Sequence, residues 1–138
     1  MVATPLGRGL ITSTFSNGEA LGDSTDKRPH IMPRFQDGNR EHNIKIVNQF
    51  KAFADKKGCT PSQLALAWVM KQGDDIFPIP GTKRIKYLEE NCASLDVALT
   101  DEEDAEIRAF GAAVELAGPC NPPAFASYLY RDTKEESK

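Results

Sequence analysis

The stretch Ile76-Phe77-Pro78-Ile79-Pro80-Gly81-Thr82-Lys83-Arg84 decides how the rest of the chain is interpreted. Its apolar residues predict a short buried strand, and Pro80-Gly81 ends that strand in a turn. Residues 85–91 then predict an amphipathic helix. The first amides of a helix have no acceptor inside it, and the helix dipole favours negative charge there. Because Lys83 and Arg84 add two cations, the stretch predicts a site for an anion such as a nucleotide phosphate.

Size and composition narrow the class of protein. The 138 residues suffice for one domain, and a chain of this length buries about two-thirds of its unfolded surface. The composition, 40% hydrophobic and 27% charged, is that of an ordinary soluble globular protein. A net charge of −3 argues against a general nucleic-acid binder, which needs a basic face. No apolar run approaches the roughly 20 residues of a membrane helix, and no signal-peptide pattern opens the chain, so we expect no membrane partner.

The cysteines and histidines give no sign of a metal site. Cys59, Cys92 and Cys120 are odd in number, far apart and without the spacing of metal ligands. They predict free thiols in a reducing compartment, and therefore a cytoplasmic protein. His30 and His42 lie in or beside a polar loop, where a lone histidine is more often solvated than catalytic.

The N-terminal part of the chain predicts a strand followed by loops. Residues 1–4 are a short apolar start, consistent with a strand, and Thr4-Pro5-Leu6-Gly7-Arg8-Gly9 comes next. Its glycines and proline exclude regular structure and let backbone amides approach a ligand, although a plain turn explains the same residues. Residues 16–39 are polar, rich in Gly and Pro, and without periodicity, which predicts a long loop. Loops of that length are usually functional lids or poorly ordered.

Periodicity and capping predict three more helices. In residues 40–57, Ile44, Val47, Phe50 and Ala54 recur at helical spacing, and we interpret their stripe as core. Two capping boxes begin the other helices, a heavily apolar one and one with an acidic first turn. The boxes are Thr60-Pro61-Ser62-Gln63 and Thr100-Asp101-Glu102-Glu103.

The segments around the last helix are predicted to be irregular. Residues 95–99 are expected to form a short extended connection, and residues 119–138 a C-terminal tail. Phe125, Tyr128 and Tyr130 suggest that the tail folds back over the molecule. Strands alternating with helices predict βα units and a parallel sheet. Two strands cannot make such a sheet alone, so the pattern indicates that part of the fold lies outside this chain.

Three stretches of the chain resemble the C-terminal part of the aldo-keto reductases, which are (β/α)8-barrel enzymes that use a nicotinamide cofactor. Residues 4–9 are similar to the family's (Ser/Thr)-Pro-Leu-Gly-Arg-Gly segment after the seventh strand. Residues 60–68, Thr-Pro-Ser-Gln-Leu-Ala-Leu-Ala-Trp, resemble a helix of the family. Residues 79–91 resemble the eighth-strand cofactor signature, as found in the bacterial and fungal branch with Ile-Pro-Gly-Thr-Lys-Arg.

The resemblance implies a fold and a cofactor. The fold would be α/β: the C-terminal portion of a (β/α)8 TIM barrel, about strands 7 and 8 with their helices, as one partial domain over residues 1–138. The cofactor would be NADP, because an uncharged ribose hydroxyl would not repay the desolvation of two cations. Thr4, Leu6, Gly7 and Arg8 would lie along the pyrophosphate, Gly81, Thr82, Lys83 and Arg84 would hold the 2′-phosphate, and Tyr87, Glu90 and Asn91 would meet the adenine.

The resemblance assigns no catalytic residue to this chain. The family's tetrad of Asp, Tyr, Lys and His lies on earlier strands, and a (β/α)8 barrel typically needs about 250 residues. Tyr128, Tyr130, His30 and His42 do not stand in the tetrad motifs. In addition, Ala3 occupies a position where the family often has an aromatic residue stacking on the nicotinamide. The adenosine half of the cofactor site is therefore better represented than the nicotinamide half.

Three interpretations follow. The first is an NADP-dependent reductase of aldehydes and ketones, inactive until missing sequence completes it. The second is a non-catalytic nucleotide-binding or interaction module, whose open barrel edge would demand a homo-oligomer or another partner. The third is a fragment that does not fold independently. The carbonyl substrate is not determined, because most of the substrate loops of the family are absent from this chain.

Overall fold

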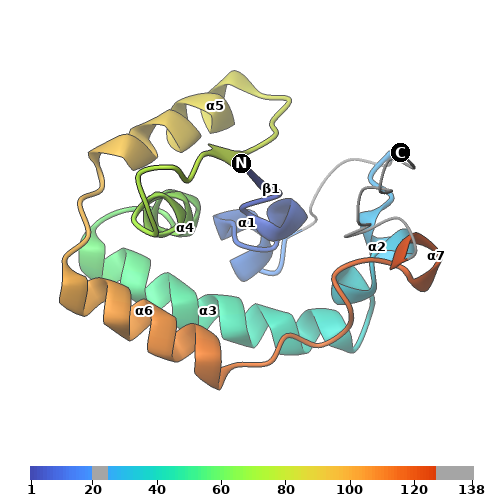
Figure 1. Cartoon of the computed structure of the whole chain (residues 1–138). Coiled ribbons are helices and arrows are strands. Elements are labelled where there is room, and N and C mark those ends of the chain that lie inside the picture. Colours follow the sequence, from blue (N-terminus) through green and yellow to red (C-terminus); the bar gives the residue numbers. More distant parts are fainter. Residues whose placement is uncertain (20–24, 127–138) are drawn as a thin grey trace, which may run out of the picture.

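The computed structural model describes residues 1–19 and 25–126, and most of its regular structure is helical (Figure 1). The elements in chain order are β1 (Val2–Ala3), η1 (Gly7–Gly9), α1 (Ser13–Ser16), α2 (Arg28–Ile31), η2 (Pro33–Phe35), α3 (Asn39–Lys57), α4 (Pro61–Met70), β2 (Pro78–Ile79), α5 (Ile85–Cys92), η3 (Ala93–Asp96), α6 (Asp101–Ala113) and α7 (Pro123–Ala126), where η denotes a 3-10 helix.

The strands β1 and β2 form a two-stranded parallel sheet. Val2 pairs with Pro78 and Ala3 with Ile79, and the Val2 amide donates a 2.8 Å hydrogen bond to the Phe77 carbonyl. Pro78 has no amide hydrogen to contribute, which helps to keep the pairing short. The strands are parallel, as the alternation with helices predicted. Their carboxyl ends therefore lie at the same edge, so the segments that follow β1 and β2 leave the sheet together.

The long helix α3 carries the core. In Figure 1 it runs beside α6, with α4 packed across the pair. Val47 belongs to one buried cluster, with Leu10, Phe15 and Phe35. Ala54, two turns further along the same face, belongs to a second cluster with Leu64 of α4 and Ile107 of α6. The predicted apolar stripe of this helix is thus confirmed as core.

Capping residues define the helix ends as the sequence predicted. The Thr60 side chain accepts from the Gln63 amide and begins α4, while Thr100 and Glu103 form the same box at the start of α6. Gly58, with φ of 76°, ends α3 in the left-handed conformation that glycine adopts without strain. Six of the ten α4 residues are buried, which confirms the heavy burial expected of that helix.

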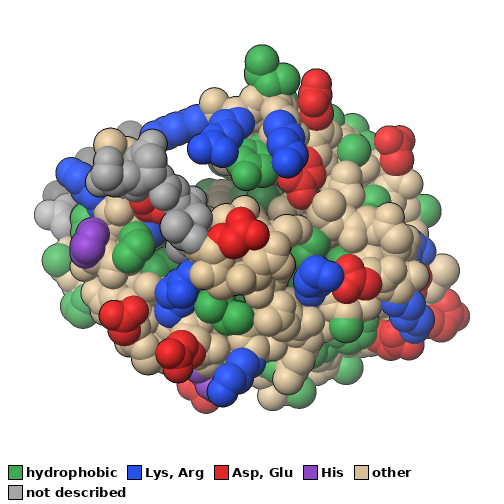
Figure 2. Space-filling model, turned by 180° about the vertical axis from the view of Figure 1, so that it is seen from behind, with side chains coloured by type: hydrophobic (Ala, Val, Ile, Leu, Met, Phe, Trp, Pro, Cys, Tyr) green, Lys and Arg blue, Asp and Glu red, His purple; other side chains and the backbone are tan. Residues whose placement is uncertain are grey.

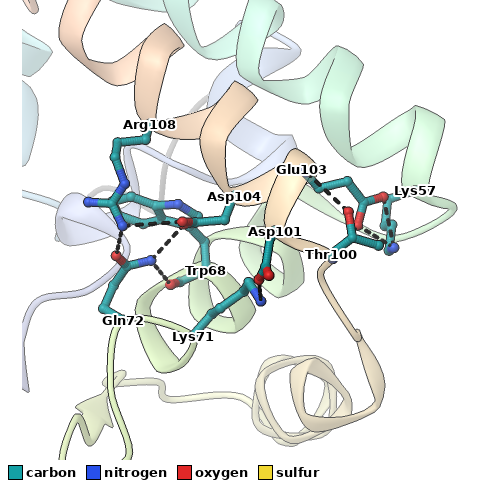
Figure 3. Close-up of polar contacts among 9 residues, drawn as sticks. All are labelled: Lys57, Trp68, Lys71, Gln72, Thr100, Asp101, Glu103, Asp104 and Arg108. Atoms are coloured by element: carbon teal, nitrogen blue, oxygen red, sulfur yellow. Dashed lines mark hydrogen bonds and ion pairs between the residues drawn. The ribbon is translucent and has the colours of Figure 1, made fainter.

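Polar side chains attach α6 to α3 and α4 (Figure 3). Lys57 pairs with Glu103 at 2.7 Å, and Lys71 pairs with Asp101 at 2.8 Å. Gln72 donates to Asp104 at 3.0 Å. Ile107 is the buried residue of α6, and these polar contacts add to its packing against Ala54 and Leu64.

The segment after α6 folds back across η2. Asn43 is fully buried, and its amide nitrogen donates to the carbonyls of Arg34 and Ala117, while its oxygen accepts from the Ala117 amide at 2.8 Å. Arg34 also donates to the Gly118 carbonyl at 3.1 Å. Residues 117–121 therefore return to the N-terminal part of the molecule. Tyr128 and Tyr130, which prompted the expectation of a returning tail, lie outside the described residues.

Two segments that were expected to be irregular contain helical turns. Residues 95–99 are not extended throughout, because the 3-10 helix Ala93–Asp96 continues α5; the Ser94 hydroxyl donates to the Asn91 carbonyl at 2.6 Å and helps to hold that turn. Within residues 16–39, the described part contains α2 and η2, each beginning at or next to a proline. None of the helices in the described ranges combines the length and the apolar character that crossing a bilayer requires.

Candidate cofactor-binding site

The segment after β1 curls tightly at the edge of the sheet. Thr4 and Arg8 have φ of 52° and 61°, in the left-handed region that costs a non-glycine residue about 1–3 kcal/mol. Gly7 and Gly9 also have positive φ. The Gly7 amide donates to the Thr4 carbonyl at 2.9 Å, which closes the first turn. Strain retained at two positions of one short edge loop is typical of a functional segment.

The guanidinium of Arg8 has neutral partners. It donates to the side-chain oxygen of Asn121 and to the sulfur of Met32, and neither carries a charge. Among the described residues, no carboxylate pairs with Arg8. Its positive charge can therefore meet an anion without breaking an ion pair.

The loop before α2 packs against this curl. Arg28 donates to the Arg8 carbonyl at 2.7 Å, and it pairs with Asp26 at 2.7 Å. The hydrogen bond from Arg28 holds the pKa of Asp26 below its usual value, and the positive charge of Lys83 adds to this effect. Lys83 belongs to the turn after β2, so the charge of that turn also acts on Asp26.

The turn after β2 presents exposed cations ahead of α5. Residues 81–86 are all exposed, and Thr82 accepts a hydrogen bond from the Arg84 amide at 3.2 Å. The Arg84 guanidinium lies over the Tyr87 ring, 5.9 Å from its centroid. A Cβ added to Gly81 would meet no described atom within 4 Å, so there is room beside the turn. Figure 2 shows Lys and Arg side chains gathered along the upper edge, over the segment that leads into α5, next to an opening.

The first turn of α5 offers amides to a ligand. The Tyr87 and Leu88 amides both donate to the Arg84 carbonyl at 3.1 Å. The amides of Ile85 and Lys86 precede these first helical bonds and have no acceptor inside the helix. Together with the helix dipole, they make the start of α5 favourable for an anion.

The second turn of α5 is partly buried and held from α4. Tyr87 and Glu90 are three residues apart and lie on one side of the helix. The Thr60 hydroxyl donates to the Glu90 carboxylate at 2.6 Å. Asn91 follows, with its carbonyl bound by Ser94.

The predicted site residues thus fall into three groups, and the fold relates them. The parallel strands bring residues 4–8 and 81–84 to one edge, and α5 connects the second group to residues 87–91. Sequence reasoning missed Asp26, Arg28 and Asn121. Asp26 and Arg28 lie in the segment predicted as a long loop, whose length was the only signal. Asn121 contacts Arg8 from 113 positions away, and no sequence pattern indicates that contact.

Parallel strands that lead through glycine turns to a helix N-terminus are typical of α/β proteins that bind phosphate-bearing ligands. A family model described as "Aldo/keto reductase family" matches residues 1–112, and the chain belongs to the aldo/keto reductase family. The family's fold is a (β/α)8 barrel, and the two parallel strands with their helices are consistent with part of one.

Two relatives show how much of such a protein the chain spans. It is 41% identical over 129 residues to "Aldo-keto reductase yakc [NADP(+)]" of Schizosaccharomyces pombe. This alignment covers 94% of this chain and 37% of the relative. The chain is 37% identical over 118 residues to "Aldo-keto reductase str7" of Strobilurus tenacellus. That alignment covers 86% of this chain and 34% of the relative. The chain therefore spans about a third of the length of these curated relatives.

The charges at the edge of the sheet fit a cofactor with phosphates. Lys51, Lys57, Lys71 and Arg108, on the helical layer, pair with carboxylates. Among the described residues, Arg8, Lys83, Arg84 and Lys86 have no such ion pair. Unneutralised cations next to free helical amides suit the pyrophosphate and the 2′-phosphate of NADP.

Proposed function

We propose that the chain is the NADP-binding C-terminal third of an aldo-keto reductase, an oxidoreductase that reduces aldehydes and ketones to alcohols. It would supply about strands 7 and 8 of the barrel with their helices. The observation that carries the proposal is the cluster of cations without ion pairs at the carboxyl edge of the parallel strands. The NADP(+) in the name of the fission-yeast relative supports the choice of cofactor.

The proposed roles are those that the resemblance to the family implies, and the positions of the residues are consistent with them. Thr4, Leu6, Gly7 and Arg8, in the strained curl after β1, would line the pyrophosphate. Gly81, Thr82, Lys83 and Arg84 would hold the 2′-phosphate in front of α5, and Tyr87, Glu90 and Asn91 would border the adenine. NADPH, when bound, supplies the hydride for carbonyl reduction. The residues of this chain bind and orient its adenosine end, and none of them is assigned the proton transfer.

The reaction would require further polypeptide. Ile85 and Leu88 form the apolar side of α5, yet they are 76% and 53% exposed. Phe77 and Ile79 beside β2 are 61% and 50% exposed. We propose that the remaining barrel units cover this face and bring the catalytic tetrad and the pocket for a small carbonyl substrate. The three unpaired cysteines favour a cytoplasmic location.

The same exposed face favours a second candidate function. A non-catalytic nucleotide-binding module could bury Ile85, Leu88 and Phe77 against a second copy of itself. Light scattering at several concentrations separates the candidates, because this module should form a dimer. A monomer at all concentrations would contradict it.

Titration with NADPH, followed by cofactor fluorescence, tests the proposed cofactor site. Wild-type chain should bind NADPH more tightly than NADH. Lys83→Ala and Arg84→Ala should each weaken NADPH binding by about 10- to 100-fold, the value of a hydrogen bond to a charged group, and leave NADH binding nearly unchanged. Lys45→Ala is a matched control, since Lys45 is an exposed lysine of α3. Equal affinity for the two cofactors would contradict the proposal.

A further inference from the structure

The two capping boxes of the protein differ in one contact. Both Thr60 and Thr100 accept a hydrogen bond from the amide three residues on, each at 3.2 Å. The Thr60 hydroxyl also donates to a residue of another helix, the Glu90 carboxylate, at 2.6 Å. Within the described ranges, the Thr100 hydroxyl has no comparable partner. Helix capping alone therefore does not require the contact to Glu90.

The protons of the Thr60 network can be assigned. A threonine hydroxyl has one proton and two lone pairs, and one lone pair accepts from the Gln63 amide. The proton then points to Glu90, and a distance of 2.6 Å is that of a charge-assisted bond to a carboxylate. The Gln63 side chain in turn accepts from the Thr60 amide at 2.9 Å. Thr60 is thus a fixed donor, because the capping box holds both its backbone and its side chain.

This donor leaves half of the Glu90 carboxylate available. Thr60 binds one oxygen, Oε1, and among the described residues no donor contacts the other, Oε2. Glu90 is partly buried, on the side of α5 that also carries Tyr87. The turn with the exposed cations begins the same helix. A carboxylate oxygen in that place suits a ligand that carries an amino group at some distance from its phosphates.

We propose that Thr60 is a positioning residue for base recognition. Its hydroxyl fixes Glu90 so that Oε2 accepts a hydrogen bond from the exocyclic amino group of adenine. This inference rests on the proposed function, because it takes the adenosine end of NADP as the ligand. Without Thr60, the Glu90 side chain samples several rotamers and must be ordered when the ligand binds, which weakens its selectivity.

The ratio of two affinities tests the proposal. Binding of NADPH is compared with binding of its hypoxanthine analogue, in which an oxygen replaces the amino group. Wild-type chain should prefer NADPH by about tenfold or more, because a site that binds a donor rejects an analogue that lacks it. Thr60→Val, which keeps the shape but loses the hydroxyl, should reduce the preference toward that of Glu90→Ala, which has no acceptor. Thr60→Ser should restore it.

Matched variants separate this role from helix capping. Thr100→Val removes the hydroxyl of the other capping box and should leave the base preference unchanged. Thr60→Gly keeps most of the capping stability but has no hydroxyl to donate to Glu90, so it should lose the preference even if Thr60→Val does not fold. The double variant Thr60→Val/Glu90→Ala should be no less selective than Glu90→Ala alone.

The outcomes distinguish the inference from the proposed function. Wild-type preference retained in Thr60→Val or in Thr60→Gly would overturn the positioning role, while a loss of NADPH affinity in Lys83→Ala would still support the cofactor site. Absence of NADPH binding by wild-type chain, or no effect of Lys83→Ala, would overturn the proposed function and the inference with it.

Discussion

The layer of α3, α4 and α6 and the segment of β2 and α5 place their apolar side chains in opposite ways. Leu64 and Ile107 in the layer are 1% and 5% exposed, whereas Ile85 and Leu88 of α5 are 76% and 53% exposed. Their charges differ in the same sense. Lys57, Lys71 and Arg108 of the layer pair with carboxylates, as in Figure 3, although within the described ranges Arg40 and Lys45 of α3 do not. The cations before α5 have no ion pair among the described residues.

This difference distinguishes the part of the chain that packs against itself from the part whose side chains lack partners among the described residues. The layer packs Ala54, Leu64 and Ile107 into one buried cluster, so its stability depends on contacts within the chain. The segment of β2 and α5 has an apolar side and a cationic side, and neither finds its partner in the described residues. We propose that its partners are other molecules: a phosphate-bearing ligand for the cations and further polypeptide for the apolar side.

Truncating one leucine in each region should give the largest contrast. Leu64→Ala should lower the free energy of unfolding by about 2–5 kcal/mol, because it leaves a cavity in the core. Leu88→Ala, at an exposed position, should change it by about 0.5 kcal/mol or less. Urea unfolding measures both. Similar losses would contradict the contrast, and a large cost of Leu88→Ala only in a longer protein would show that the added chain covers α5.

Alanine at two glycines should give effects of opposite sign. Gly118 has φ of 83°, and a Cβ there would lie 3.2 Å from the Pro33 carbonyl carbon, so Gly118→Ala should destabilise by about 1–3 kcal/mol. Gly111 lies inside α6 with open space around it, and Gly111→Ala should stabilise by about 0.5 kcal/mol. Thermal unfolding checks both. Stabilisation by Gly118→Ala would show that residues 117–121 are not held against η2.

Acid should weaken the attachment of α6 by a smaller amount. The hydrogen bond from Lys57, followed by that from the Thr100 amide, lowers the pKa of Glu103 below its ordinary value of 4.5. The folded state therefore binds this proton less readily than the unfolded state. The stabilisation is complete above pH 4.5 and is lost as the pH falls through the lower pKa of the folded protein. Urea unfolding at pH 7 and pH 3 should show a smaller loss for Glu103→Gln than for wild type, and an equal loss would exclude Glu103 as a source.

Much of the helical layer could be predicted from local sequence. Thr60 with Gln63 and Thr100 with Glu103 bond within one turn, so their spacing alone implies the contact. The stripe of Val47 and Ala54 likewise follows from helical periodicity. The curl after β1 and the turn after β2 were located as glycine-containing loops. The roles of their individual residues in binding NADP stay predictions.

The contacts that could not be predicted join segments far apart in sequence. Arg8 meets Asn121, Asn43 meets Ala117, and Thr60 meets Glu90. Each pair contains at least one common polar side chain, which would serve equally well on a solvated surface. The extended structure expected at residues 95–96 also failed, because Ser94 bonds to Asn91 and continues the turn of α5.

By itself, the sequence determined the helices α3, α4, α5 and α6, the caps of α4 and α6, the parallel relation of the strands and the resemblance to the aldo-keto reductases, because short-range bonding and periodicity specify these. Only the tertiary structure decided that α5 exposes its apolar side, that Arg8 has neutral partners and that α4 anchors Glu90. Those features depend on which distant groups are present to pair, and a pattern within one helix holds no information about its neighbours.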